Sequence, residues 1–259
     1  MSRRQPISLR IPSIPVTGRF SKGESNFERN CSTFCQRTDA NMILILGGSQ
    51  GLGAQIAQIY RDQGAEVLTV GRTGDLKHDL DDETSTHRLV TKIVEFAKFN
   101  RAITHFYWVA GVLISGPLSE QTEGDVLKMI DINFRNAATV AAAVWKEMSN
   151  AKAECRFVVV SSTTGLSETP SADEAIYAAT KAAQVSMTRA LGKPNKSDRL
   201  KVSLFCPGGM KTAFWDNNEI VQATYDSFLE PAAVAAAIVK DVEAQATPYF
   251  ERVIPRGSL

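Results

Sequence analysis

After an N-terminal segment without regular periodicity, short apolar runs alternate with stretches in which apolar residues recur every three or four positions. The run Met42–Leu46 is apolar throughout and ends in glycines, which is typical of a strand buried on both faces of a sheet. Leu52, Ile56 and Ile59 then follow at helical spacing. This spacing predicts an amphipathic helix that ends at Gly64.

The same alternation continues to the end of the chain. Further strands are predicted at 67–70, 103–109, 157–160, 202–205 and 250–254. Helices are predicted around 89–97, from the capping box of Thr122 and Asp125, around 141–144, over 174–191, and from Pro231 onward. We therefore predict an α/β fold over residues 42–259, a three-layer doubly wound parallel sheet (Rossmann fold) in a single domain. Ligands of such sheets bind beyond the carboxyl ends of the strands.

Residues 1–41 have a different composition. They carry basic residues but no acidic residue before Glu24, and three prolines interrupt any helix. We predict a disordered N-terminal extension. Two interpretations remain open: an organellar transit peptide, or an upstream extension from a mis-assigned start, with the working protein beginning at Met42.

Composition limits the classes of partner. The chain has 259 residues, 44% of them hydrophobic, and a formal net charge of +1, so no overall field favours nucleic acid or an acidic membrane. The four cysteines and three histidines lack metal-site spacing, and no metal is expected. Buried thiols at Cys155 and Cys206 fit a reducing, cytoplasmic location, unless 1–41 directs import. No apolar run reaches the roughly 18 residues that span a bilayer.

Glycines follow the first strand in the sequence Gly47-Gly48-Ser49-Gln50-Gly51-Leu52-Gly53. Glycine allows a pyrophosphate to approach the backbone, and the following helix offers free N–H groups and a positive dipole end. The turn thus predicts a dinucleotide site. The same residues also match the G-x-S-x-G elbow of serine hydrolases with Ser49 as nucleophile. That class places its histidine last in the chain, whereas no histidine follows His105 here.

The end of the second predicted strand indicates which cofactor binds. An acidic residue there usually accepts a hydrogen bond from a free ribose 2′-hydroxyl. This chain instead has Gly71, Arg72 and Thr73, and a guanidinium with a hydroxyl suits a 2′-phosphate. We predict NADP as cofactor, with NAD less favoured.

Tyr177 and Lys181 are four residues apart in the predicted helix 174–191, so both project from one helix face. A tyrosine with a pKa near 10 is a poor acid or base at neutral pH, and a close ammonium lowers that pKa. We predict that this pair performs proton transfer.

These motifs together resemble the single-domain short-chain dehydrogenase/reductases. GxxxGxG at 47–53 and YxxxK at 177–181 are the signatures of that family, and the resemblance covers essentially all of 42–259. Asp131-Ile-Asn133, Ser161-Ser162-Thr-Thr-Gly165 and Pro207-Gly208 with Thr212 match three further motifs of the family.

The resemblance implies an NADP-dependent oxidoreductase that interconverts a carbonyl and an alcohol on a small organic substrate by hydride transfer. It implies Tyr177 as general acid/base, Lys181 lowering its pKa and holding the nicotinamide ribose, Ser162 bonding the substrate oxygen, and Asn133 supporting a proton relay. The residues expected to bind the cofactor are Gly47, Ser49, Gln50, Gly51, Leu52, Gly53, Arg72, Thr73, Asp79, Ala110, Gly111, Tyr177, Lys181, Pro207, Gly208 and Thr212.

The chain departs from the family pattern in three places. Trp108-Val109-Ala110-Gly111 replaces the usual Asn-Asn-Ala-Gly, and Leu46 replaces a threonine. Ser162 is two residues farther from Tyr177 than is common, and Ser161 is the reserve candidate. Loss of both asparagines leaves open a second class, a catalytically weak dinucleotide-binding regulatory or scaffold protein.

Substrate contacts are expected from 113–118, 165–173 and 213–228, where Phe214 and Trp215 form either a pocket wall or part of the core. Alanines are frequent in 137–143 and 178–183. The family resemblance implies a homodimer or homotetramer built on these two helices, and internal packing is the alternative.

Overall fold

The computed structural model describes residues 41–98, 102–167, 170–215 and 222–259. The predictions for residues 1–40 lie outside these ranges. Asp39–Leu259 forms one compact unit, and every element named below belongs to it.

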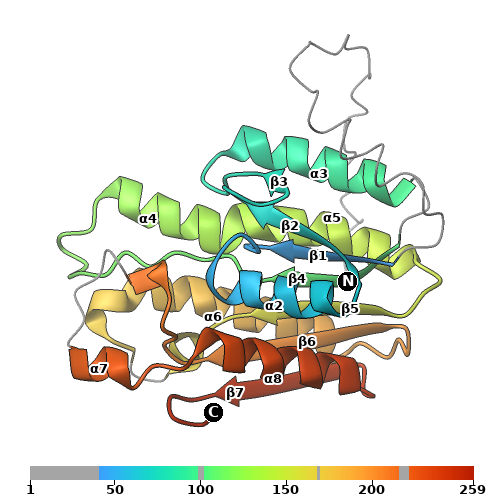
Figure 1. The fold of residues 1–259 in the computed structure, drawn as a ribbon. Coiled ribbons are helices and arrows are strands. Elements are labelled where there is room, and N and C mark those ends of the chain that lie inside the picture. The colour runs from blue at the N-terminus through green and yellow to red at the C-terminus, as the bar shows by residue number, and fades with distance from the viewer. Residues whose placement is uncertain (1–40, 99–101, 168–169, 216–221) are drawn as a thin grey trace, which may run out of the picture. The chain divides into compact units, whose positions relative to one another are not determined.

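Parallel strands form one sheet with the order β3-β2-β1-β4-β5-β6-β7 (Figure 1). The strands are β1 (Met42–Leu46), β2 (Glu66–Gly71), β3 (Leu76–Lys77), β4 (Ile103–Trp108), β5 (Cys155–Val160), β6 (Leu200–Pro207) and β7 (Tyr249–Ile254). The order reverses direction after β1, which is the switch point of a doubly wound sheet. The predicted Rossmann-type α/β fold is confirmed.

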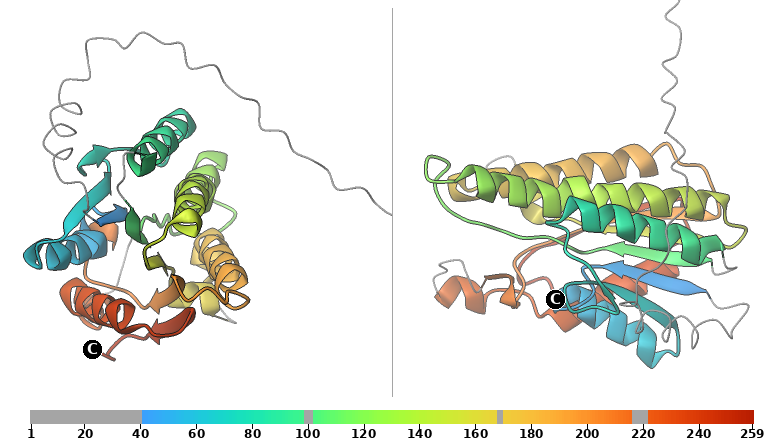
Figure 2. Two further views of the ribbon diagram at one scale, coloured as in Figure 1. Left: turned by 90° about the vertical axis from the view of Figure 1, so that its right-hand side faces the viewer. Right: turned by 90° about the horizontal axis from the view of Figure 1, so that it is seen from above.

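Helices cover both faces of the sheet (Figure 2). They are α2 (Gly51–Asp62), α3 (Glu83–Lys98), α4 (Glu123–Ile130), α5 (Asn136–Asn150), α6 (Ala175–Gly192), α7 (Gln222–Asp226) and α8 (Pro231–Ala244). Helices α2 and α8 pack together on one face, and α3 packs on α5 on the other, where α6 also lies. The result is the predicted three-layer arrangement.

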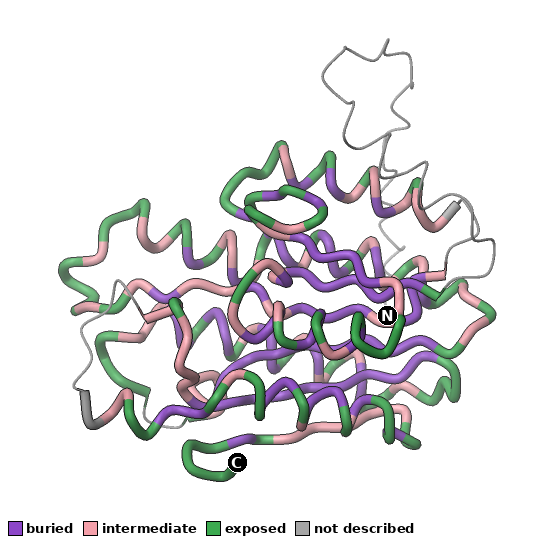
Figure 3. Tube along the Cα trace, viewed as in Figure 1, coloured by how far each residue is buried: buried purple, intermediate pink, exposed green. Residues whose placement is uncertain are grey.

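The core lies between the sheet and its helices (Figure 3). All five residues of β1 are buried, as the apolar run predicts. Ile56 of α2 and Ile238 of α8 are fully buried in one cluster with Tyr107 of β4. Each such side chain stabilises the fold by about 1.5–3 kcal/mol relative to an exposed one.

Two features of the fold are not predicted by the sequence pattern. Strand β3 has only two residues and pairs Leu76 with Val70, which is too short for a hydrophobic period. A π-helical turn, Asp131–Arg135, joins α4 to α5.

The predicted capping box is present at the start of α4, where Asp125 N donates to Thr122 Oγ1 at 3.1 Å and Thr122 N donates to Asp125 Oδ2 at 3.1 Å.

Candidate active site

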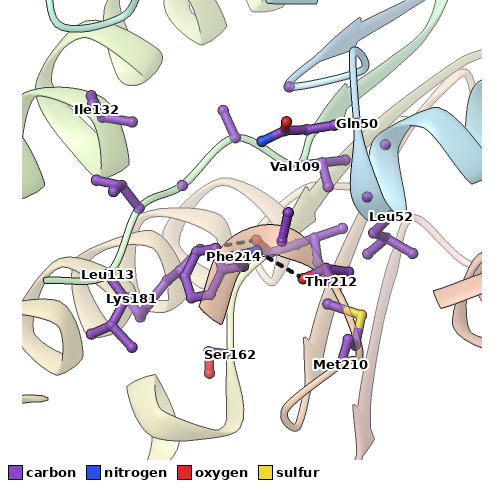
Figure 4. A pocket seen from close by; sticks show the side chains of 18 of the residues that line it. Gln50, Leu52, Val109, Leu113, Ile132, Ser162, Lys181, Met210, Thr212 and Phe214 are labelled. Carbon is purple, nitrogen blue, oxygen red and sulfur yellow. Dashed lines mark hydrogen bonds between the residues drawn. The ribbon is translucent and has the colours of Figure 1, made fainter. Parts of the chain in front are cut away.

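A cavity of about 430 Å³ opens beyond the carboxyl ends of the central strands. Its lining includes every site residue predicted from the sequence except Thr73 and Asn133. Figure 4 shows Gln50 and Leu52 of the glycine turn at one side of the cavity, and Lys181 and Leu113 at the other. Motifs from distant parts of the chain thus meet in one place.

The glycine turn has no room for side chains at two positions. Gly47 has φ of +88°, and a Cβ there would lie 2.5 Å from Ala110 N. A Cβ on Gly53 would lie 2.2 Å from Gly47 O. The Gln50 side chain does not cap α2, and the first turn of the helix holds no acidic residue. The positive end of α2 therefore borders the cavity in a form that suits an anion such as a pyrophosphate.

The end of β2 has a glycine, Gly71, directly before the cation of Arg72. A Cβ on Gly71 would lie 2.5 Å from Ser49 Oγ, so the Ser49 hydroxyl occupies the volume that a side chain at position 71 would need. Arg72 is exposed at the rim of the cavity, and Asp79 also lines it. Thr73 does not line the cavity, and its contact with the cofactor stays a prediction.

Tyr177 is buried at the start of α6, with its ring 6.0 Å from that of Phe214. Burial raises the pKa of Tyr177 above its ordinary value, the Ser162 hydroxyl partly offsets this rise, and the charge of Glu174 adds to it. The predicted lowering of this pKa by Lys181 is wrong for this structure. Lys181 Nζ lies 5.8 Å from the ring centroid and forms its hydrogen bonds elsewhere.

Lys181 is buried, and its ammonium donates to Gln184 Oε1 at 3.1 Å and to Val160 O at 3.5 Å. Burial lowers the pKa of Lys181 to about 8. Gln184, which is fully buried, donates from Nε2 to Asn133 O at 2.7 Å. The sequence analysis missed Gln184, and its only signal is a polar residue at a buried position of α6.

Asn133 is fully buried in the π-helical turn and does not line the cavity. Its Nδ2 donates to Val112 O at 2.9 Å and to Thr180 Oγ1 at 3.0 Å, while Oδ1 accepts from Val112 N at 2.7 Å. The side chain is thus occupied by structural bonds. The backbone carbonyl of Asn133 connects to Lys181 through Gln184, and the support of a proton relay by Asn133 stays a prediction.

The loop after β4 is held without the family's two asparagines. Val109 N and Ala110 N both donate to Leu46 O, at 2.9 and 3.0 Å. Trp108 is fully buried, 6.3 Å from the ring of Phe134. Backbone bonds and apolar packing therefore fix this loop beside the glycine turn.

The structure separates the roles of the two serines after β5. Ser161 Oγ donates to Lys181 O at 2.9 Å, which ties β5 to α6. Ser162 Oγ accepts from Thr164 N at 3.1 Å and interacts with the Tyr177 hydroxyl. Ser162 is therefore the better candidate for contact with a substrate oxygen.

Apolar side chains form the outer end of the cavity. Phe214 and Trp215 line it and also pack against the buried group Leu113, Met129 and Tyr177, so both predicted roles, wall and core, apply. Four charged residues that the sequence analysis did not predict also border the cavity: Asp81, Lys128, Glu174 and Arg256. Residues 168–169 and 216–221 of the predicted substrate segments lie outside the described ranges.

The hydrolase interpretation finds no support in the geometry. The ring of His78, the one histidine on the cavity wall, lies 2.9 Å from Ser85 Oγ and 3.4 Å from Thr86 Oγ1. His87 lies near Glu83, and His105 near Glu243. None of them pairs with Ser49.

In the part of the chain that the structure describes, no cluster of three His, Cys, Asp or Glu side chains could hold a metal ion. No helix in the same ranges is long and apolar enough to cross a membrane.

Comparisons with known proteins agree with the fold and the motifs. The family model described as short chain dehydrogenase matches residues 41–222. The 3-ketodihydrosphingosine reductase of Bacteroides thetaiotaomicron is 28% identical over 243 residues, which is 83% of this chain and 88% of that protein. The uncharacterized oxidoreductase YbbO of Escherichia coli is 30% identical and covers 78% of this chain and 77% of its own.

Solved structures show the same fold. ElxO with NADP bound superposes with a TM-score of 0.70 at 24% identity, over 85% of this chain and 98% of that one. 4-Hydroxyisoleucine dehydrogenase complexed with NADH gives 0.69 at 21% identity, over 84% and 98%.

Proposed function

Because this chain belongs to the short-chain dehydrogenase/reductase family of oxidoreductases, which act on CH–OH and C=O groups, we propose that it interconverts a carbonyl and an alcohol on a small organic molecule with NADP as cofactor. The observation that carries this proposal is the meeting of Tyr177, Ser162 and Lys181 in the cavity that the glycine turn borders. The Bacteroides relative, named as a reductase of a keto compound, supports it.

Side chains of the protein donate the proton that the reduction of a carbonyl requires. Ser162 and Tyr177 each carry a hydroxyl that can donate to the substrate oxygen, where negative charge develops during reduction. Since burial raises the pKa of Tyr177, the phenol stays protonated at neutral pH and is ready to act as the acid. Bound NADPH would supply the hydride. In the reverse reaction, the phenolate of Tyr177 would act as the base.

The cofactor contacts follow from the cavity lining. The turn Gly47–Gly53 would hold the pyrophosphate, and Lys181 the nicotinamide ribose. Thr212 lies across from this turn, since a Cβ on Gly51 would be 3.5 Å from Thr212 Cγ2. Pro207 and Gly208 border the same space, and Asp79 would contact the adenine.

We propose NADP rather than NAD because no acidic side chain stands at position 71 and Arg72 reaches the rim. Arg72→Gln should raise KM for NADPH about 10- to 100-fold, the usual effect of losing one charge-assisted contact, and leave KM for NADH unchanged. Arg88→Gln, an exposed arginine that does not line the cavity, is the matched control. A clear preference of the parent enzyme for NADH would refute the proposal.

The deciding experiment follows NADPH oxidation across a panel of ketones, aldehydes and quinones. Tyr177→Phe should lower kcat by about 10²- to 10⁴-fold while NADPH still binds, as measured by its fluorescence. If the variant and the parent are equally fast, Tyr177 is not the acid.

The alternative is a dinucleotide-binding regulatory or scaffold protein with little turnover. The absence of the family's two asparagines at Trp108 and Val109 favours it. NADPH binding without oxidation of NADPH by any compound in the panel would select this alternative.

Two further properties are proposals that follow from the family and the sequence. Exposed alanines on α5 and α6, at Ala142, Ala179 and Ala182, would allow close helix contact in a homodimer or homotetramer. A monomer in light scattering would refute this.

The buried free thiols Cys155 and Cys206 fit a reducing compartment, and we propose the cytoplasm, to be checked by cell fractionation.

A further inference from the structure

Glu174 places a carboxylate at the substrate end of the cavity. It ends a short 3-10 turn, Ala172–Glu174, precedes the first residue of α6 and lies three residues before Tyr177. The residue is half-buried and lines the cavity together with Tyr177, Thr164 and Phe214.

The carboxylate of Glu174 has only a weak partner. Thr164 Oγ1 donates to its Oε2 at 3.4 Å, and among the described residues no Lys, Arg or His nitrogen lies within 4.0 Å of it. The Arg256 guanidinium interacts at longer range and stacks at 4.7 Å on the ring of Phe228.

Three other carboxylates of the described residues, one exposed (Glu154) and two partly buried (Asp241 and Glu251), form ion pairs. Glu154 Oε2 lies 2.8 Å from Lys201 Nζ, and Asp241 Oδ2 lies 2.6 Å from Arg252 Nη1. Glu251 pairs with Arg189. A half-buried carboxylate without a cation is costly unless something else compensates its charge. Glu174 is the exception, and it is the one of these acids that borders the cavity.

The electrostatics agree with this position. Burial raises the pKa of Glu174, while Arg256 lowers it and Asp173 adds to the rise. Glu174 in turn raises the pKa of Tyr177, so the carboxylate and the catalytic phenol interact electrostatically. A group bound between them and the apolar wall would contact both.

We propose that Glu174 binds a protonated amine on the substrate, so that the preferred substrates are amino ketones, or the matching amino alcohols, with an apolar remainder. The cation would supply the partner that the carboxylate lacks, and Phe214, Trp215 and Leu113 would cover the apolar part. This inference rests on the proposed carbonyl reduction and names the substrate class of the same site.

The test compares two ketones of equal length, one with an ammonium close to the carbonyl and one with a methyl group in its place. The parent enzyme should prefer the amino ketone, and Glu174→Gln should lower kcat/KM for it about 10- to 100-fold, as expected for a lost bond to a charged group. Reduction of the uncharged ketone should hardly change. Asp173→Asn removes the same charge one residue away, outside this cavity, and should leave both rates as they are.

A purely structural role for Glu174 gives a different result. A carboxylate at the start of α6 also stabilises the helix dipole, and losing that effect would lower thermal stability without changing the choice between the two ketones. An unchanged preference in Glu174→Gln, or an equal loss in Asp173→Asn, overturns the proposal.

The experiments distinguish a failure of the proposed carbonyl reduction from a failure of the proposed amine binding by Glu174. If neither ketone is reduced, the proposed reaction fails, and Glu174 is then tested by binding alone. An alkyl amino alcohol, added with NADPH, should raise the melting temperature of the parent protein more than that of Glu174→Gln. Equal shifts would refute the role of Glu174 independently of turnover.

Discussion

Lys181 carries a positive charge in a buried position, which makes that charge sensitive to pH. Its ammonium has two acceptors, Gln184 Oε1 and Val160 O, and burial lowers its pKa to about 8. A lysine with its ordinary pKa would remain charged well above that pH. The charge at the centre of the site is therefore present at neutral pH and lost in mildly alkaline solution.

We expect NADPH affinity to fall as the pH rises through about 8, because the ammonium that attracts the anionic cofactor loses its proton. Lys181→Met should bind NADPH more weakly at neutral pH and show no such fall. Fluorescence titrations at several pH values would measure both. A parent protein whose affinity is constant through this range would contradict the assignment.

Gln184→Met tests the positioning of Lys181. The change keeps the side-chain volume but removes the acceptor at 3.1 Å from Nζ, so the ammonium becomes harder to keep charged. We expect the alkaline fall in NADPH affinity to move to lower pH while the folded structure persists. Gln58→Met, an exposed glutamine on α2, is the control, and an identical pH profile in Gln184→Met would rule out the positioning role.

At the scale of elements, a polar group connects α2, β4 and α8. Tyr60 donates to Glu243 Oε1 at 2.6 Å and lies at the same distance from the Tyr107 hydroxyl. His105 Nε2 lies 3.2 Å from Glu243 Oε1. His105, then Tyr60, lower the pKa of Glu243 to about 2 despite partial burial. The carboxylate thus joins two helices of one face to a strand of the sheet that they cover.

Glu243→Gln should lower the free energy of unfolding by about 1 kcal/mol at neutral pH, a value reduced by the exposure of the side chain. Because the folded pKa lies below the ordinary 4.5, this stability is present above that pH and is lost as the pH falls towards about 2. The difference from the parent should shrink over the same range. Urea titrations measure it, with the exposed Glu95→Gln as control, and a constant difference would contradict the pairing.

The sequence predicts the regular elements well because burial on both sides of a sheet leaves a continuous apolar run, as in β1. It also predicts the cavity lining, since the motifs consist of residues whose spacing is set locally. It fails at Glu174 and Gln184, which belong to no motif and gain their importance from neighbours distant in the chain. The raised pKa of Tyr177 is missed because burial depends on the whole fold.

At the scale of the molecule, the first described strand lies at the very start of the described residues. Met42 begins β1, and its N–H donates to Ala102 O at 3.0 Å. We expect a chain that starts at Met42 to fold with the same melting temperature and to bind NADPH equally well. Calorimetry and fluorescence titration of the two forms would measure this. A shortened chain that aggregates or binds NADPH less tightly would show that residues 1–41 contribute to the working domain.

The parallel order of the sheet also determines when the protein can assemble during synthesis. Among the strands that the structure describes, none pairs through a tight hairpin: Met42 of β1 pairs with Ile103 of β4, and Val202 of β6 pairs with Tyr249 of β7. Such distant pairings make folding slow. The outer edge of β6 stays open until β7, which ends at Ile254, has left the ribosome. A nascent chain will therefore expose the unpaired N–H and C=O groups of a strand edge until translation is complete, and chaperones that bind such edges should bind it.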